Sequence, residues 1–125
     1  MQAGYTFVFY GSLDNHLWVA ISDPLIDADQ PVVIVSFTSY REGKDPTCIL
    51  HPGDHSFITR DTAVYYADAR EVPHSHLEDL ANSGKLVRKD NLTTQVLARI
   101  RQGAAESPHI PLGCRKILVE QGLIE

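Results

Sequence analysis

The chain is poor in cysteine and has no long apolar run. Its 125 residues include two cysteines, Cys48 and Cys114, which are far apart and form no C-x-x-C pair. A disulfide framework is therefore excluded, and we expect two free thiols in a reducing compartment. No apolar run approaches the roughly 20 residues that span a bilayer, and the first residues form no basic leader. We therefore expect a cytoplasmic protein with no membrane partner.

Motifs of several common enzyme classes are also missing. The sequence has no G-x-S-x-G motif and no glycine-rich phosphate loop, so neither a serine hydrolase nor a nucleotide-binding enzyme is indicated. We expect no cofactor. The apolar content of 43% and charged content of 22% are typical of a globular protein, and the length suits one domain with a single buried core.

Basic residues are scarce in the first two-thirds of the chain. Residues 1–84 carry four basic and twelve acidic side chains, a net charge of −8, whereas residues 85–125 carry seven and four, a net charge of +3. An acidic surface of this kind is a poor non-specific binder of nucleic acid, because phosphate contacts depend on lysine and arginine. Any contact with RNA or DNA must therefore be local or use the C-terminal part.

The first seventy residues have the pattern of short strands. Apolar and β-branched runs alternate with turn residues, and residues 11–15 predict the turn of a hairpin. Residues 30–39 form a continuous apolar run with Pro31 at its start, which indicates a central strand buried on both faces. The predicted strands are residues 5–10, 16–22, 30–39, 47–50, 56–58 and 62–67. This spacing favours a small barrel or a curled antiparallel sheet.

Helices are predicted after residue 73. Residues 73–84 have Pro73 in the first turn and Gly84 at the end, and residues 90–103 have an Asp90 or Asn91 cap before an apolar stripe. Residues 112–121 predict a third helix. The expected fold is mostly β with C-terminal helices (α+β): a barrel of five to six antiparallel strands over residues 1–72, and a helical part over residues 73–125 that packs on it or extends from it within one domain.

A Pro-Gly turn flanked by two histidines invites a chemical interpretation. His51 and His55 surround Asp54, and a turn has no backbone need for histidine. Acid–base catalysis is one alternative, with His16 or His55 as base or acid and Asp54 orienting a histidine. Another is that Asp54 caps backbone N–H groups and His55 is hydrogen-bonded, so that the turn is structural.

Two other site types remain open. Cys48, His51, Asp54 and His55 carry the donor types that zinc prefers, although their spacing is not a strong zinc motif. Trp18, Tyr65 and Tyr66 could stack on nucleic-acid bases, although an aromatic in a small β-domain more often lies in the core.

The order of elements resembles the PemK/MazF-like toxins of bacterial toxin–antitoxin systems. The likeness lies in the hairpin, the apolar strand ending in Phe37-Thr-Ser39, the polar loop, the short strands and the segment from Asp61 to Val72, and it covers about residues 5–86. Members of that family are SH3-like barrels that cut RNA. Their apolar strand ends in a Thr-Ser pair at the active site, which Thr38 and Ser39 match.

One position departs from the family pattern. The family usually opens its second strand with Arg-Pro, whose arginine acts in cleavage, and this chain has His16-Leu17. An imidazole can replace the arginine chemically, because attack by a 2′-hydroxyl needs a general base and a general acid. The expected catalytic residues are His16, Thr38, Ser39 and His55. The expected substrate-binding residues are Arg41, Asp54 and Arg60.

The resemblance implies a divergent toxin that cleaves single-stranded RNA by metal-independent acid–base catalysis. Its expected partners are an antitoxin protein, single-stranded RNA and a second copy of the chain in a homodimer. The alternative is a non-catalytic SH3-like barrel module that binds a protein or nucleic acid, with residues 85–125 as its docking arm.

Overall fold

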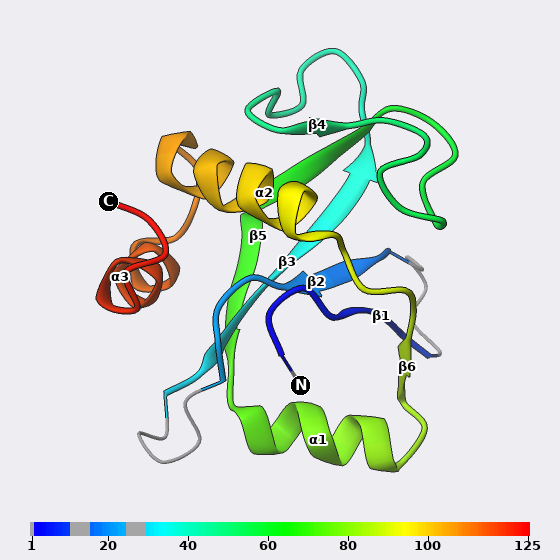
Figure 1. The fold of residues 1–125 in the computed structure, drawn as a ribbon, viewed down its shortest axis with the longest axis vertical. Helices are drawn as coiled ribbons and strands as arrows, with labels where there is room; N and C mark the ends of the chain where they lie inside the picture. The colour runs from blue at the N-terminus through cyan, green and yellow to red at the C-terminus, as the bar shows by residue number, and fades with distance from the viewer. Residues whose placement is uncertain (1, 11–15, 25–29) are drawn as a thin grey trace.

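The structure, a computed structural model, describes residues 2–10, 16–24 and 30–125 (Figure 1). Six strands form one antiparallel sheet in the order β4-β5-β3-β2-β1-β6. The strands are β1 (Thr6–Phe9), β2 (Trp18–Ala20), β3 (Val32–Ser39), β4 (Ile49–Leu50), β5 (Thr62–Val72) and β6 (Leu86–Arg88). The helices are α1 (His74–Asn82), α2 (Thr94–Glu106) and α3 (Leu112–Glu120). The predicted α+β class, mostly β with C-terminal helices, is confirmed.

β3 is the central strand that the apolar run predicts. It pairs with β2 on one side and β5 on the other. Val33, Val35 and Phe37 belong to one buried cluster, and Val32 and Ile34 belong to a second. Because successive side chains point to opposite faces of a sheet, both faces of β3 are buried.

Helices cover the two faces of this sheet. α2 and α3 contribute Ile100 and Leu118 to the larger cluster, and α1 contributes Leu77 to the smaller one. Figure 1 shows α2 lying across β5 and β3, with α1 at the opposite end of the sheet beside β6. The predicted Asp90 or Asn91 cap of α2 is wrong, because the Thr93 side chain accepts the hydrogen bond from the Val96 N–H.

Three strand assignments differ from the sequence prediction. Residues 56–58 form a turn, since the Ile58 N–H donates to the His55 carbonyl at 3.0 Å. β5 continues to Val72, well beyond the predicted residue 67, as it pairs along nearly all of β3. β6 was not predicted, and it lies beside β1.

The sheet is open in the pairings that the structure describes. β4 and β6 are its two edges, and closure into the expected SH3-like barrel is not shown by the pairings among residues 2–10, 16–24 and 30–125. β1 and β2 pair antiparallel as the predicted hairpin requires, while the predicted turn at 11–15 lies outside the described residues. Among the described helices, none has the length and apolar character needed to cross a membrane.

Candidate functional site

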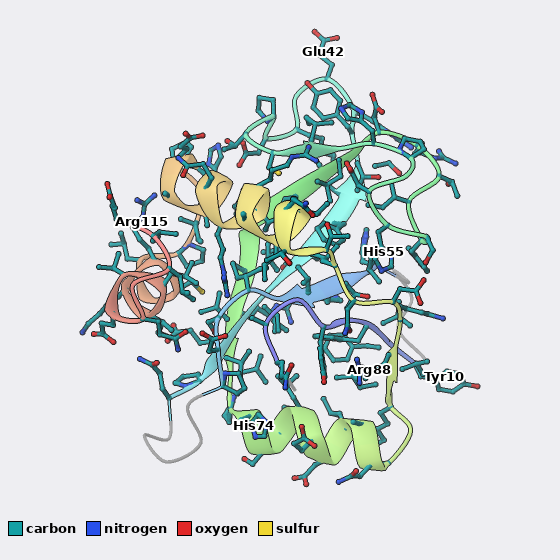
Figure 2. The ribbon with its side chains drawn as sticks, viewed as in Figure 1. Tyr10, Glu42, His55, His74, Arg88 and Arg115 are labelled. Carbon is teal, nitrogen blue, oxygen red and sulfur yellow. The ribbon has the colours of Figure 1, made fainter. Side chains whose placement is uncertain are left out.

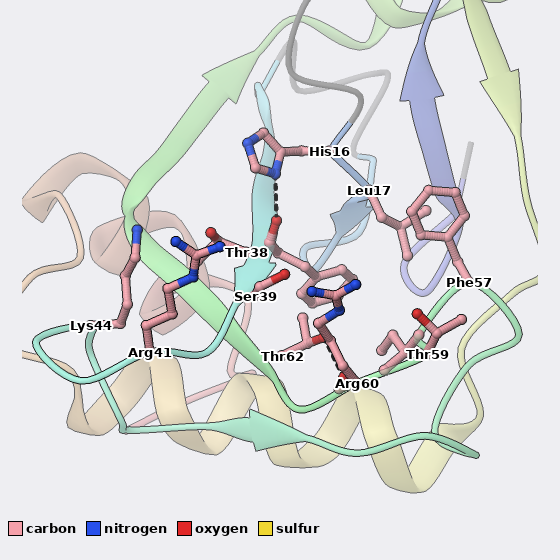
Figure 3. Close-up of a pocket in the computed structure, with 12 residues that line it drawn as sticks. His16, Leu17, Thr38, Ser39, Arg41, Lys44, Phe57, Thr59, Arg60 and Thr62 are labelled. Atoms are coloured by element: carbon pink, nitrogen blue, oxygen red, sulfur yellow. Dashed lines mark hydrogen bonds between the residues drawn. The ribbon is translucent and has the colours of Figure 1, made fainter.

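A pocket of about 540 Å³ opens where β3 ends (Figure 3). Its walls come from the segment before β2, the end of β3, the loops that follow β3 and precede β5, and the start of β5. Five residues predicted from the sequence meet there: His16, Thr38, Ser39, Arg41 and Arg60. The other lining residues are Leu17, Phe37, Lys44, Phe57, Ile58, Thr59 and Thr62.

Thr38 and Ser39 are held at the mouth of the pocket by the sheet. β3 is buried as far as Phe37, and its last two residues are only partly buried. They stay in the ladder, since Thr38 pairs with Ala63 and Ser39 with Thr62. Two hydroxyl groups are therefore fixed on a rigid strand end, where each can donate a hydrogen bond to a ligand.

His16 is anchored to the same strand end. The Phe37 N–H donates to the Leu17 carbonyl at 3.0 Å, and His16 Nδ1 lies 2.9 Å from the Phe37 carbonyl oxygen. A carbonyl oxygen only accepts, so Nδ1 carries the proton in this contact. In the neutral ring, Nε2 then keeps its lone pair and is the nitrogen able to accept a proton.

The pocket is cationic. Its walls include Arg41, Lys44 and Arg60 and contain no carboxylate. Among the described residues, no side-chain hydrogen bond or ion pair holds the Arg41 or Arg60 guanidinium, whereas Arg99 pairs with Asp54 at 3.3 Å. A guanidinium presents several N–H donors in a plane that matches phosphate oxygens. The arrangement therefore suits an anion with several oxygens.

His55 lies outside the pocket and is held by the protein (Figure 2). Its side chain is buried, with 6% of the residue exposed. Its Nδ1 accepts the Phe57 N–H at 3.0 Å, so Nε2 carries the proton, which it donates to the Asp90 carbonyl at 2.6 Å. Thr6 Oγ1 lies 3.0 Å from the same Nε2. Both ring nitrogens are thus engaged in hydrogen bonds within the protein, and the structure does not bring His55 to the predicted site.

Asp54 also lies outside the lining of the pocket. Its Oδ2 accepts the His51 N–H at 2.8 Å and pairs with Arg99. The backbone hydrogen bond from His51, together with Arg99, holds the pKa of Asp54 below its ordinary 3.8. These are the contacts of a capping carboxylate in a turn, as the structural alternative for this segment expects.

The zinc alternative finds no support in the structure. Within residues 2–10, 16–24 and 30–125, no three histidine, cysteine or acidic side chains are grouped to hold a metal ion. Cys48 is buried, and that burial raises the pKa of its thiol. His51 turns to Asp61, with Nδ1 2.7 Å from the carboxylate.

Four polar or aromatic lining residues were missed by sequence reasoning: Lys44, Phe57, Thr59 and Thr62. Lys44 had a usable signal, because it is a cation in the same short loop as Arg41. Phe57 lies in a segment that the sequence predicts as a strand and that forms a turn in the structure. Thr59 and Thr62 carry no pattern that separates a pocket wall from an ordinary loop.

Comparison of the chain with protein-family models and with curated proteins gives no match. The PemK/MazF-like resemblance therefore rests on the residues of this sequence alone.

Proposed function

We propose that this chain is a divergent PemK/MazF-like toxin that cleaves single-stranded RNA in the pocket at the end of β3. The reaction is metal-independent acid–base catalysis, with His16, Thr38 and Ser39 at the reacting phosphate. Arg41, Lys44 and Arg60 bind the anionic backbone. His55 and Asp54 support the surrounding loop.

The charge of the pocket is the observation that carries this proposal. The chain has a net charge of −5, yet three cations and no carboxylate line the hollow in which the hydroxyls and imidazole meet. Anion binding depends on local cations more than on the net charge, because salt screens charges that lie more than a Debye length away. The local positive charge favours an anionic ligand, and the phosphodiester of RNA is such a ligand.

The first half of the reaction uses the anchored imidazole. Nε2 of His16 takes the proton from a ribose 2′-hydroxyl, and the 2′-oxygen then forms a bond to the adjacent phosphorus. The Phe37 carbonyl holds Nδ1 in place. Metal-free transfer of this kind needs a base in a fixed orientation, which the backbone contact supplies.

The second half separates the two RNA fragments. Negative charge grows on the non-bridging oxygens, where the Arg41 and Arg60 guanidiniums and the Thr38 and Ser39 hydroxyls stabilise it. The bond from phosphorus to the 5′-oxygen breaks, and Lys44 donates the proton that this oxygen takes up. The products are a 2′,3′-cyclic phosphate and a 5′-hydroxyl.

The toxin proposal includes partners and a location. A cationic active-site pocket is a docking place for an antitoxin with acidic side chains, since opposite charges steer association. A homodimer and a cytoplasmic location belong to the same proposal.

A non-catalytic module that binds a protein or nucleic acid is the second candidate, favoured by the net charge of −5. In that case residues 85–125 are not a free arm. β6 joins the sheet, and α2 contributes Val96, Leu97 and Ile100 to the buried core.

Expression under tight induction separates the two candidates. Wild type, His16→Ala, Thr38→Val and the surface control His76→Ala are compared for growth arrest and RNA integrity. We expect arrest with fragmented RNA from the wild type and His76→Ala, and neither effect from the other two variants. Normal growth and intact RNA with wild type would overturn the toxin proposal and favour the binding module.

A further inference from the structure

Two further cavities border the central pocket. One, of about 540 Å³, is lined by Ser56, Phe57, Arg88, Lys89 and Asp90 and shares Phe57 with the pocket. The other, of about 430 Å³, shares Thr38 and Lys44 with it. Figure 3 shows Lys44 and Phe57 at opposite sides of the pocket, with Thr38 and Ser39 between them. The two cavities therefore flank the central pocket.

Each flanking cavity has an exposed aromatic ring in its wall. Tyr65 is 42% exposed and lines the cavity beyond Lys44, and Phe57 is 39% exposed and lines the other. Tyr66 and Trp18, the other aromatics that the sequence offered as stacking surfaces, are buried. A large exposed ring next to a polar hollow offers a free face on which a base can stack.

Cations accompany both rings. Lys44 Nζ lies 5.8 Å from the centre of the Tyr65 ring. In the other cavity, Arg88 is fixed by stacking 3.6 Å from the centre of the Tyr5 ring and by a 2.9 Å hydrogen bond to Asn91. An aromatic face beside a cation is the pair of groups that holds a base and its phosphate.

Carboxylates in these walls are mostly turned to protein partners. Asp45 accepts hydrogen bonds from Thr47 and Ser107. Asp90 accepts one from Ser56 at 2.5 Å. Glu42 projects away from the body at the top of Figure 2. Together the three linings hold five basic and three acidic side chains, a net charge of +2, which favours a polyanion, although the cavity beyond Lys44 has two acidic side chains and one basic one.

We propose that the three hollows form one groove for single-stranded RNA, in which Phe57 and Tyr65 stack on bases at either side of the reacting phosphate. This inference rests on the proposed function, which places the reacting phosphate in the pocket at the end of β3. Arg41, Lys44 and Arg60 hold the central backbone, and Arg88 and Lys89 hold the backbone beyond Phe57. Duplex RNA is excluded as a ligand, because a paired and stacked base offers no free face to either ring.

Binding to an uncleavable RNA tests the groove apart from catalysis. The probe is a fluorescent single-stranded RNA with 2′-O-methyl groups at every ribose, which blocks attack by the 2′-oxygen, and the readout is anisotropy. Tyr65→Leu and Phe57→Leu remove one ring each. Tyr10→Leu is the matched control, since Tyr10 is 77% exposed, projects outward in Figure 2 and lines none of the three cavities.

We expect each ring variant to raise Kd about 5- to 150-fold, the usual range for loss of one stacked base, and Tyr10→Leu to leave Kd unchanged. A hairpin duplex of the same modified RNA is expected not to compete. Weakening by both ring variants supports the groove even if unmodified RNA is not cut, in which case catalysis alone fails. Cleavage that persists with Kd unchanged in both ring variants overturns the groove and leaves the proposed function intact. Absence of binding by wild type overturns the groove, and intact unmodified RNA then overturns the proposed function as well.

Discussion

The imidazole Nδ1 of His16 lies 2.9 Å from the carbonyl oxygen of Phe37. The segment before β2 is thereby attached to the end of β3, next to Thr38 and Ser39, the two hydroxyl residues that end that strand. This contact fixes the tautomer in which Nε2 can take a proton. In the proposed mechanism, the same side chain therefore makes a structural hydrogen bond and acts as the base.

Asparagine at position 16 separates those two roles. In His16→Asn the amide N–H replaces Nδ1–H as the donor to Phe37, but no group remains to accept a proton. We expect unchanged thermal unfolding and a loss of RNA cleavage of about 10²–10⁴-fold, the usual worth of a general base. His76→Asn on the surface of α1 is the control and keeps full cleavage. Full cleavage by His16→Asn would show that His16 is not the base.

His55 is expected to matter for stability and not for chemistry. Replacing it with alanine leaves the Phe57 N–H without its acceptor and removes one of the two donors to the Asp90 carbonyl, which keeps the Thr6 hydroxyl. Loss of a partner costs about 1–3 kcal/mol for a buried polar group. Among the described residues, the ring of the exposed His51 pairs with Asp61 alone, so His51→Ala is expected to cost about 0–1 kcal/mol. Urea unfolding of both variants checks this. A stable His55→Ala protein without activity would instead place His55 in the reaction.

Gly103 packs against the Tyr66 phenol, which donates a 2.7 Å hydrogen bond to the Ile100 carbonyl. A Cβ at position 103 would collide with the phenol oxygen and approach Cys48 Cβ at 3.1 Å. We expect Gly103→Ala to lower the free energy of unfolding by about 1–3 kcal/mol, although the same change in an open helix raises it by about 1 kcal/mol. Calorimetry provides the measurement.

Gly113→Ala is the matched control for this substitution. A Cβ added at position 113 would meet the carboxylate end of Glu71, a flexible side chain that can move aside. We expect no loss of stability there. Equal effects at the two glycines would contradict the packing account of Gly103.

Asp45 links stability to acid pH. Burial alone would raise the pKa of Asp45, but hydrogen bonds from Thr47 and Ser107 hold it below the ordinary 3.8. Because the pKa is lower in the folded state, the ionised carboxylate stabilises the protein above pH 3.8, and this contribution is lost as the pH falls from there through the folded pKa.

The Asp45→Asn variant lacks this contribution. We expect wild type to exceed the variant in unfolding free energy near neutral pH, and the difference to narrow below pH 3.8. Urea unfolding over a series of acidic pH values measures it. A difference that does not change with pH would show that the Asp45 hydrogen bonds do not depend on its charge.

The elements with long, local patterns could be predicted from the sequence. β3 follows from a continuous apolar run, and α2 from its apolar stripe. β6 could not be predicted, because it has three residues and exists through pairing with β1, far away in the chain. Residues 56–58 form a turn, although the sequence predicts a strand there. The two apolar residues Phe57 and Ile58 are too few to show a periodicity that separates a strand from a turn.

The site was predictable in part for a similar reason. Thr38 and Ser39 end a recognisable strand, and His16 lies two residues before its neighbour β2, so pairing of β2 with β3 brings these positions together. His55 and Asp54 carry the same residue types as a catalytic pair, and only their partners show that they serve the turn. Residue type alone does not separate those two uses of a histidine.

Cleavage by the purified protein is the most direct test of the central claim. Single-stranded RNA is incubated with the purified protein and a metal chelator, and the ends of any products are identified. The account predicts 2′,3′-cyclic phosphate and 5′-hydroxyl ends, and no cleavage when the ribose at the cut site is replaced by 2′-deoxyribose. Intact RNA, or cutting that the 2′-deoxy substitution leaves unchanged, would contradict it.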